Sequence, residues 1–257
     1  MINQENIMMH TPIVIGLVGF KESGKTYFGK YLEKNYTFKR LSFAQGIKDV
    51  STIFFNVYMS KDGIIHNIKD NESFYNKIKS TPNFLQIFNN VLKYLNINKD
   101  INDIEFYILN EIQNILIKYY TVDTDEQRNE HARKLWQYLG TEFGRAVNKN
   151  IWINFIDNLI GDNLELLENR IVIDDVRFDN EFNYIKHIKD THNIKSYLIG
   201  IQSDKSAKFK KTIGYKGHST ETDISRLLKL CDYTIINKYN DTFYDSIDTT
   251  INNLLLK

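Results

Sequence analysis

The sequence predicts an α/β protein built on a five-stranded parallel sheet that is covered by helices. Short apolar runs rich in β-branched and aromatic residues favour strands at Ile13–Val18, Phe38–Ser42, Arg170–Ile173, Lys195–Ile201 and Tyr233–Asn237. Helical patterns separate these runs, and few polar residues interrupt the runs themselves. Strands that alternate with helices and are apolar on both faces are typical of a parallel sheet buried between two helical layers.

The clearest helical pattern lies between the second and third expected strands. Apolar residues three and four apart form one stripe along residues 101–120, and Ile247, Ile251, Leu254 and Leu255 form a similar stripe near the C-terminus. The separation between these two strands is too long for a single crossover helix. We therefore expect a core made of residues 12–54 and 165–257, with residues 55–164 forming an inserted helical lobe.

The composition predicts a folded protein of the reducing cytoplasm. Hydrophobic residues make up 42% and charged residues 25% of the 257 positions, and the net charge of +1 gives no excess field for binding nucleic acid. The single cysteine, Cys231, excludes an intramolecular disulfide and a cysteine-based zinc site. No apolar run approaches the roughly 20 residues needed to cross a bilayer, and residues 1–11 are too polar for a signal sequence, so we expect no membrane partner.

A phosphate-binding loop is predicted directly after the first strand. Residues 19–26, GFKESGKT, fit the pattern G-x-x-x-x-G-K-[ST] and precede a helix-compatible segment. Its two glycines let backbone N–H groups converge on an anion at the positive end of that helix. Lys25 would reach the outer phosphates and Thr26 would ligate Mg²⁺. The alternative is a glycine-rich strand-to-helix turn with a solvated lysine.

Two adjacent carboxylates, Asp174 and Asp175, follow the third apolar run. Open parallel sheets bind ligands at the carboxyl ends of their strands, and a carboxylate there can hold Mg²⁺ opposite Thr26. The alternative is that both aspartates cap the helix that begins near Asp179. Arg177 has the planar guanidinium that suits a phosphate, although a salt bridge would equally explain it.

The segment from Trp136 to Arg145 mixes glycines with amide, hydroxyl, carboxylate and guanidinium groups. Gln137 and Thr141 are four apart and share one face if the turn is helical, so they could bind a base edge while Arg145 meets a phosphate. The alternative is a helix that ends at Gly140, followed by a polar loop.

Taken together, these motifs resemble the deoxynucleoside monophosphate kinases of bacteriophages and large DNA viruses, a branch of the P-loop nucleoside monophosphate kinase fold. The shared segments, in order, are GFKESGKT, Leu41–Ala44 with Ile47–Asp49, KLWQYLGTEFGRAVNKNIWINFI, VIDDVRFDNE, His218–Glu221 and Asp232–Asn237. The resemblance as a whole extends from residue 13 to the C-terminal region. Only QYLGTE and DDVRFDNE are specific when taken singly.

The resemblance implies Mg²⁺-dependent transfer of the γ-phosphoryl group of ATP to a deoxynucleoside 5′-monophosphate, in the cytoplasm of a host cell if the protein is viral. It implies an ATP site of Gly19, Lys21, Ser23, Gly24, Lys25, Thr26, Tyr27 and Asn237, with Mg²⁺ on Thr26 and Asp175. The implied acceptor site comprises Phe43, Lys48, Gln137, Thr141, Glu142, Arg145 and Trp152. Lys25, Arg145, Asp175 and Arg177 would be the catalytic residues.

The resemblance also implies a lid at about residues 203–217. Members often carry an arginine where this chain has Gln202, which leaves Lys205, Lys208, Lys210, Lys211 and Arg226 as candidates for the lid's cation. His218 and Glu221 match a family motif to which the residues alone assign no role. The lysine-rich lid segment could equally be a solvated surface loop.

Two other functions remain open at this point. A kinase for another small phosphorylated acceptor, such as dephospho-coenzyme A, would use a similar sheet, and a DNA-handling ATPase would use a similar loop. The near-neutral charge disfavours the ATPase. We expect small-molecule nucleotides as partners, while the preferred base, the sugar and the choice between monomer and homodimer stay open.

Overall fold

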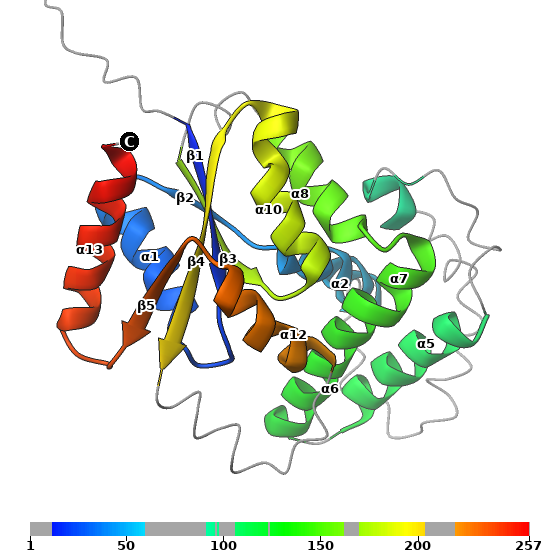
Figure 1. Cartoon of the computed structure of the whole chain (residues 1–257). Helices are drawn as coiled ribbons and strands as arrows, with labels where there is room; N and C mark the ends of the chain where they lie inside the picture. The colour runs from blue at the N-terminus through cyan, green and yellow to red at the C-terminus, as the bar shows by residue number, and fades with distance from the viewer. Residues whose placement is uncertain are drawn as a thin grey trace, which may run out of the picture. The chain divides into compact units, whose positions relative to one another are not determined.

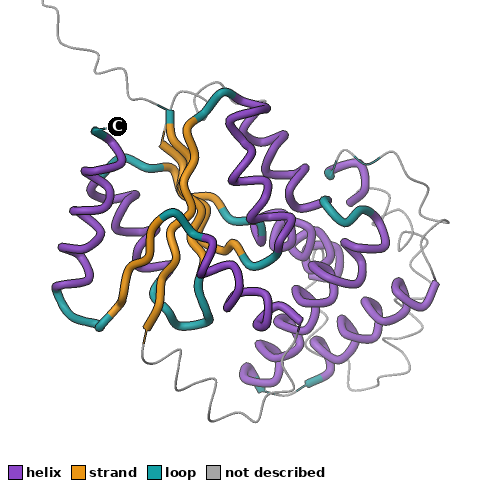
Figure 2. Tube along the Cα trace, viewed as in Figure 1, coloured by secondary structure: helices purple, strands orange, loops and turns teal. Residues whose placement is uncertain are grey.

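The computed structural model describes residues 12–59, 91–95, 97, 106–122, 124–161, 170–203 and 219–256. The chain divides into two compact units. The first consists of Met1–Phe43 and Ile156–Lys257, and the second of Ala44–Phe155. The strands all belong to the first unit, whereas the described elements of the second unit are helices (Figure 2).

The first unit contains one sheet of five parallel strands, which confirms the predicted fold class. The strands are β1 (Ile13–Val18), β2 (Lys39–Leu41), β3 (Arg170–Val176), β4 (Lys195–Ser203) and β5 (Tyr233–Asn237), in the order β2-β3-β1-β4-β5. Every neighbouring pair is parallel. Strand β1 is central, so the loop that follows it begins at the carboxyl edge of the sheet, beside the ends of β3 and β4.

Strands β1 and β5 have the predicted bounds, and the other three differ from prediction. Strand β3 continues past Ile173, where its apolar pattern stops, because its pairing with β1 runs on to Val176 and Asp174 within it forms an ion pair. Strand β4 extends two residues further to Ser203, opposite Asn237 of β5. Strand β2 is shorter than expected.

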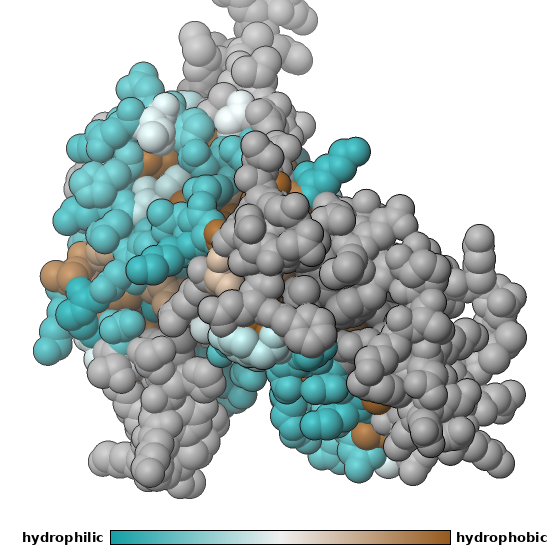
Figure 3. All heavy atoms as spheres, turned by 90° about the vertical axis from the view of Figure 1, so that its right-hand side faces the viewer, coloured by the Kyte–Doolittle hydropathy of each residue, from teal (hydrophilic) through white to brown (hydrophobic). Residues whose placement is uncertain are grey.

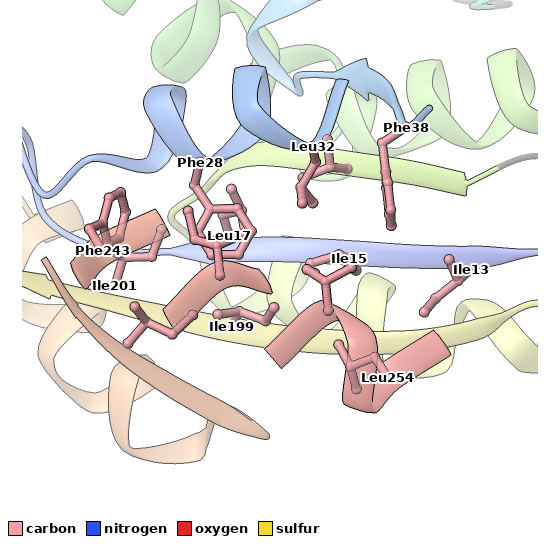
Figure 4. Close-up of a cluster of buried hydrophobic side chains, with 14 residues drawn as sticks. Ile13, Ile15, Leu17, Phe28, Leu32, Phe38, Ile199, Ile201, Phe243 and Leu254 are labelled. Atoms are coloured by element: carbon pink, nitrogen blue, oxygen red, sulfur yellow. The ribbon is translucent and has the colours of Figure 1, made fainter. Parts of the chain in front are cut away.

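Two helices cover one face of the sheet. Helix α1 (Lys25–Asn35) follows β1, and helix α13 (Thr242–Leu255) follows β5 (Figure 1). Their buried side chains, among them Phe28, Leu32 and Phe243, pack against strand residues such as Ile15 and Leu17 in one continuous core (Figure 4). All six residues of β1 are buried, as its unbroken apolar sequence predicts.

Helix α10 (Asp179–His192) covers the opposite face. It packs against the sheet where β1 has a glycine: a Cβ at Gly16 would lie 3.0–3.2 Å from side-chain carbons of Leu198 and Ile185. Helix α12 (Ser219–Leu227) and the 3-10 turn η4 (Leu228–Leu230) lie beside α10 and β4 respectively. The central strand is therefore enclosed on both faces.

The second unit contains helices α2 (Ala44–Met59), α5 (Phe106–Thr121), α6 (Asp125–Tyr138) and α7 (Gly144–Val147), with a π-helical turn η3 (Leu139–Phe143). Helix α8 (Ile151–Gly161) begins in this unit. In α5 the predicted stripe is buried at Ile108, Ile112, Ile115 and Leu116. The start of that stripe, residues 101–105, lies outside the described residues.

The described residues on the face drawn in Figure 3 are mainly hydrophilic, with small hydrophobic patches among them. Within the described ranges, none of the helices combines the length and the apolar character that a membrane span requires.

Candidate functional site

The loop Gly19–Thr26, called the phosphate-binding loop below, has the conformation that its two glycines predict. Gly24 has a φ of 105°, in the left-handed region. A Cβ at Gly19 would lie 2.5 Å from Ser23 Oγ and 2.6 Å from the carbonyl oxygen of Ile201. Gly24 is the N-cap of α1, so the loop delivers the first N–H groups of an 11-residue helix to the carboxyl edge of the sheet.

Lys25 places a positive charge over this loop. Its Nζ donates hydrogen bonds to the carbonyl oxygens of Gly19 at 2.6 Å and Phe20 at 2.8 Å. Thr26 lies in the first turn of α1 with its side chain exposed, and the side chains of Lys21 and Tyr27 are also exposed. The loop thus presents a cation, a hydroxyl group and a helix N-terminus together, which is what a polyphosphate requires.

The structure separates the two candidate aspartates of β3. Asp174 is 7% exposed and forms an ion pair with Arg40, whose Nη1 lies 3.0 Å from its Oδ2. Asp175 is half-buried; its Oδ1 accepts a hydrogen bond from the backbone N–H of Phe43 at 2.9 Å, and its Oδ2 accepts one from Ser42 Oγ at 2.6 Å.

The position of Asp175 in the sheet favours it as the metal candidate. It immediately precedes Val176, which pairs with Val18 at the end of β1. Its carboxylate therefore belongs to the strand end that neighbours the phosphate-binding loop, whereas the charge of Asp174 is already matched by Arg40.

Arg177 is exposed directly after β3, and a buried carboxyl group holds its backbone. Oε2 of Glu181 accepts hydrogen bonds from the N–H groups of Arg177 at 2.7 Å and Phe178 at 3.1 Å. Burial, together with the negative charge of Asp175, raises the pKa of Glu181 to about 8. No role for Glu181 was predicted from the sequence, although a glutamate at the third position of a helix is a known capping signal.

Asn237 does not lie free at the end of β5. It is 3% exposed; its Nδ2 donates a hydrogen bond to the carbonyl oxygen of Ser23 at 3.0 Å, and its Oδ1 accepts one from the N–H of Tyr239 at 2.8 Å. This residue of the expected ATP set therefore contacts the phosphate-binding loop itself.

In the second unit, the segment with Gln137 and Thr141 is one continuous helix rather than a helix ended by Gly140. α6, η3 and α7 follow one another without a break (Figure 1), and the N–H of Gly144 donates to the carbonyl oxygen of Leu139, five residues earlier. The side chains of Gln137 and Glu142 are exposed, and that of Thr141 is half-buried.

The π-helical turn changes which residues share a face. In an α-helix, residues four apart are offset by about 40° around the axis, so Gln137, Thr141 and Arg145 would spread over about 80°. A π-turn closes its hydrogen bonds over one more residue, which cancels much of this offset. The Cα positions of the three residues therefore come close to one line along the helix.

Trp152 supports this turn from α8. Its indole Nε1 donates a hydrogen bond to the carbonyl oxygen of Gly140 at 2.9 Å, and its side chain is buried, with the residue 8% exposed. A Cβ at Gly144 would lie 2.8 Å from the same nitrogen. The glycines of this segment thus allow the tryptophan to approach the helix backbone closely.

The remaining candidates lie as follows. Lys48 is exposed on α2, and Phe43 in the first unit is 2% exposed, with its ring centroid 6.2 Å from that of Tyr184. Arg226 of α12 forms an ion pair with Asp179. Lys205, Lys208, Lys210, Lys211 and His218 lie outside the described residues, as do residues 204–217 of the expected lid and the side chains of Arg145 and Glu221.

A parallel sheet of order β2-β3-β1-β4-β5, with a glycine-lysine-threonine loop between its central strand and the next helix, defines a P-loop protein of the kinase type. A sequence profile of the deoxynucleotide monophosphate kinase family matches residues 13–221, and the chain belongs to this family. No curated protein matches the chain. The profile match includes the phosphate-binding loop, Asp175 and the segment around Gln137, and it ends before β5.

Proposed function

We propose that the chain transfers the γ-phosphoryl group of ATP to the 5′-phosphate of a deoxynucleoside monophosphate in a Mg²⁺-dependent reaction. The observation that carries this proposal is the phosphate-binding loop, where a left-handed Gly24 begins α1 and Lys25 lies over the loop carbonyls. Membership of the kinase family supports the acceptor class.

The donor's phosphates would enter at the N-terminus of α1. The ammonium group of Lys25 would exchange its bonds with the carbonyls of Gly19 and Phe20 for the β- and γ-phosphate oxygens. Arg177, exposed beside the end of β3 and fixed through its backbone by Glu181, would neutralise charge on the transferred group.

The residues present suit Mg²⁺. Asp175 offers a half-buried carboxylate and Thr26 an exposed hydroxyl, and Mg²⁺ prefers such oxygen ligands together with phosphate oxygens and water. When bound, the ion would supply positive charge that reduces the negative charge of the phosphates. The two hydrogen bonds that Asp175 accepts from Ser42 and Phe43 would keep its carboxylate oriented.

The second unit would supply most of the acceptor contacts. Gln137 and Thr141 would hydrogen-bond the base, and Arg145 would bind the 5′-phosphate, because their backbone positions follow one line on the helix that contains the π-turn. Lys48 and Glu142 present exposed charged groups, and Phe43 and Trp152, the other members of the expected acceptor set, are buried.

The chemistry needs no general base. An oxygen of the acceptor's 5′-phosphate is already anionic at neutral pH, because the second pKa of a phosphate monoester is near 6. That oxygen attacks the γ-phosphorus, the bond to the β–γ bridging oxygen breaks, and ADP leaves with the electron pair. The protein's task is to align two polyanions and to stabilise the transferred group.

The test is an ADP-release assay with every ribo- and deoxyribonucleoside monophosphate as acceptor. We expect release that depends on one or a few deoxynucleotides and on Mg²⁺. Release with dephospho-coenzyme A alone would support the other kinase, and acceptor-independent release stimulated by DNA would support the ATPase. Either result would overturn the proposal.

A further inference from the structure

Two residues at the C-terminal end of β5 hold the backbone of the phosphate-binding loop. Asn237 donates through Nδ2 to the carbonyl oxygen of Ser23 at 3.0 Å. The hydroxyl group of Tyr239 donates to the carbonyl oxygen of Glu22. These two carbonyls immediately precede Gly24, and both partners lie more than 200 residues away in the sequence.

The two residues are themselves fixed to the sheet. The Oδ1 of Asn237 accepts the backbone N–H of Tyr239, which has a φ of 59°, and the Tyr239 hydroxyl lies 3.0 Å from Ser203 Oγ. Ser203 and Asn237 are paired neighbours at the ends of β4 and β5. Asn237 and Tyr239 therefore contact the loop from positions that are held by the paired ends of β4 and β5.

The direction of these hydrogen bonds matters for anion binding. A peptide group is planar, and its C=O and N–H point in opposite directions. When Asn237 holds the carbonyl of Ser23, the N–H of Gly24 points away from Asn237; a carbonyl turned the other way would repel a phosphate. Such a reversal is accessible to this peptide, because Gly24 lacks a Cβ and its φ is little restricted.

The space around Gly24 is adapted to the same contact. A Cβ at Gly24 would lie 2.3 Å from Asn237 Nδ2, closer than atoms can approach. The second glycine of the loop is thus required by its φ of 105° and also by the asparagine behind it.

We propose that Asn237 and Tyr239 are positioning residues for the phosphate-binding loop. Asn237 holds the carbonyl of Ser23 outward so that the N–H of Gly24 faces the triphosphate of the donor, and Tyr239 holds the preceding peptide, whose N–H on Ser23 closes the loop on the carbonyl of Phe20 at 3.2 Å. This role differs from the direct contact with ATP that the resemblance implies for Asn237. The buried amide is bonded at both its nitrogen and its oxygen, and a base contact would require it to rearrange. The proposal rests on ATP being the donor.

The test compares the binding of ATP with that of inorganic tripolyphosphate, which has no base, by titration calorimetry at fixed Mg²⁺. Tyr239→Phe removes one hydroxyl group, and Asn237→Ala removes the amide. We expect Tyr239→Phe to weaken both ligands by the same factor, about two- to tenfold, and Asn237→Ala to weaken both at least as much. Tyr244→Phe removes a hydroxyl group from α13 and serves as the matched control, with unchanged binding.

Two results would overturn the proposal. A loss of ATP binding with tripolyphosphate binding retained would place these residues at the base, and unchanged binding of both ligands would show that the loop does not need them. The thermal midpoint of each variant checks the fold, and Tyr239→Phe decides the matter if Asn237→Ala does not fold. Because binding is measured without an acceptor, the test of the positioning role does not depend on whether the chain transfers a phosphoryl group.

Discussion

Exchanging each of the two adjacent aspartates of β3 for asparagine should give opposite phenotypes. Asp175→Asn should raise the Mg²⁺ concentration required for half-maximal transfer, because the variant loses a negative charge beside the phosphate-binding loop. Asp174→Asn should leave the Mg²⁺ requirement nearly unchanged and lower stability, because its carboxylate is matched by Arg40. Each variant is thus the matched control of the other.

The structure sets the size of each effect. The side chains of Asp174 and Arg40 are 8% and 32% exposed, between a surface pair and a buried pair, so Asp174→Asn should cost about 1–3 kcal/mol. For a chain of this length that cost lowers the unfolding midpoint by about 2–12 °C. Losing a carboxylate that holds a metal directly or through water should reduce apparent Mg²⁺ affinity about 10- to 100-fold in Asp175→Asn.

The assay is initial-rate ADP release over a range of Mg²⁺ concentrations at saturating ATP, with thermal unfolding measured on the same samples. A larger shift in Mg²⁺ requirement for Asp174→Asn than for Asp175→Asn would refute the assignment. It would mean that the carboxylate paired with Arg40 is the one that meets the metal. Equal, small shifts in both would place the metal on other ligands.

Four further outcomes are expected. Lys25→Ala should fold normally but transfer phosphate on the order of a thousandfold more slowly in single-turnover assays, and full activity would contradict its role. Arg145→Lys should weaken acceptor binding about ten- to a hundredfold and leave ATP binding unchanged, with each nucleotide titrated separately. The reason is that an ammonium group does not reproduce the bidentate geometry of the guanidinium. Equal losses of affinity for ATP and for the acceptor would argue that Arg145 lies at the donor site. Trp152→Phe, which loses the hydrogen bond to Gly140, should raise the acceptor KM with the ATP KM unaffected; a change in both would refute a local effect. The last outcome concerns Glu181→Gln and is measured by urea unfolding in the absence of Mg²⁺ and nucleotide. The free energy of unfolding of the wild type should fall relative to that of the variant as pH rises from about 4.5 to about 8, because folding raises the pKa of Glu181 and so favours its protonated form. A difference between the two proteins that does not vary with pH would contradict that pKa.

The parts of the fold that could be predicted from the sequence are those that short segments of the chain determine. The unbroken apolar residues of β1 and the glycines after it determine the strand, the loop and the start of α1 from within about twenty residues. The extension of β3 was missed because polar Asp174 interrupts the apolar pattern, and its partner Arg40 is 134 residues away in the sequence.

The details of the candidate site that the sequence left open depend on partners in other elements. Gly140 has the sequence signature of a helix end, yet the helix continues through it as a π-turn, and Trp152 contacts its carbonyl group from the next helix. The contact of Asn237 with Ser23 has no local signature at all. Glu181 is the exception, since a glutamate at the third position of a helix is the carboxylate half of a capping box and lies in the local sequence, although Phe178 lacks the hydroxyl group of the other half.

The contact between Asn237 and Ser23 has a consequence for the order of assembly during synthesis. The ribosome makes the phosphate-binding loop first, and the side chains that hold its carbonyls come 214 residues later or more. Contacts this distant in sequence form late, because a long loop must close first. A nascent chain released before residue 239 would contain the complete glycine-lysine motif without both of the side chains that hold its carbonyls. The ability to bind a triphosphate should therefore appear only once translation has passed β5.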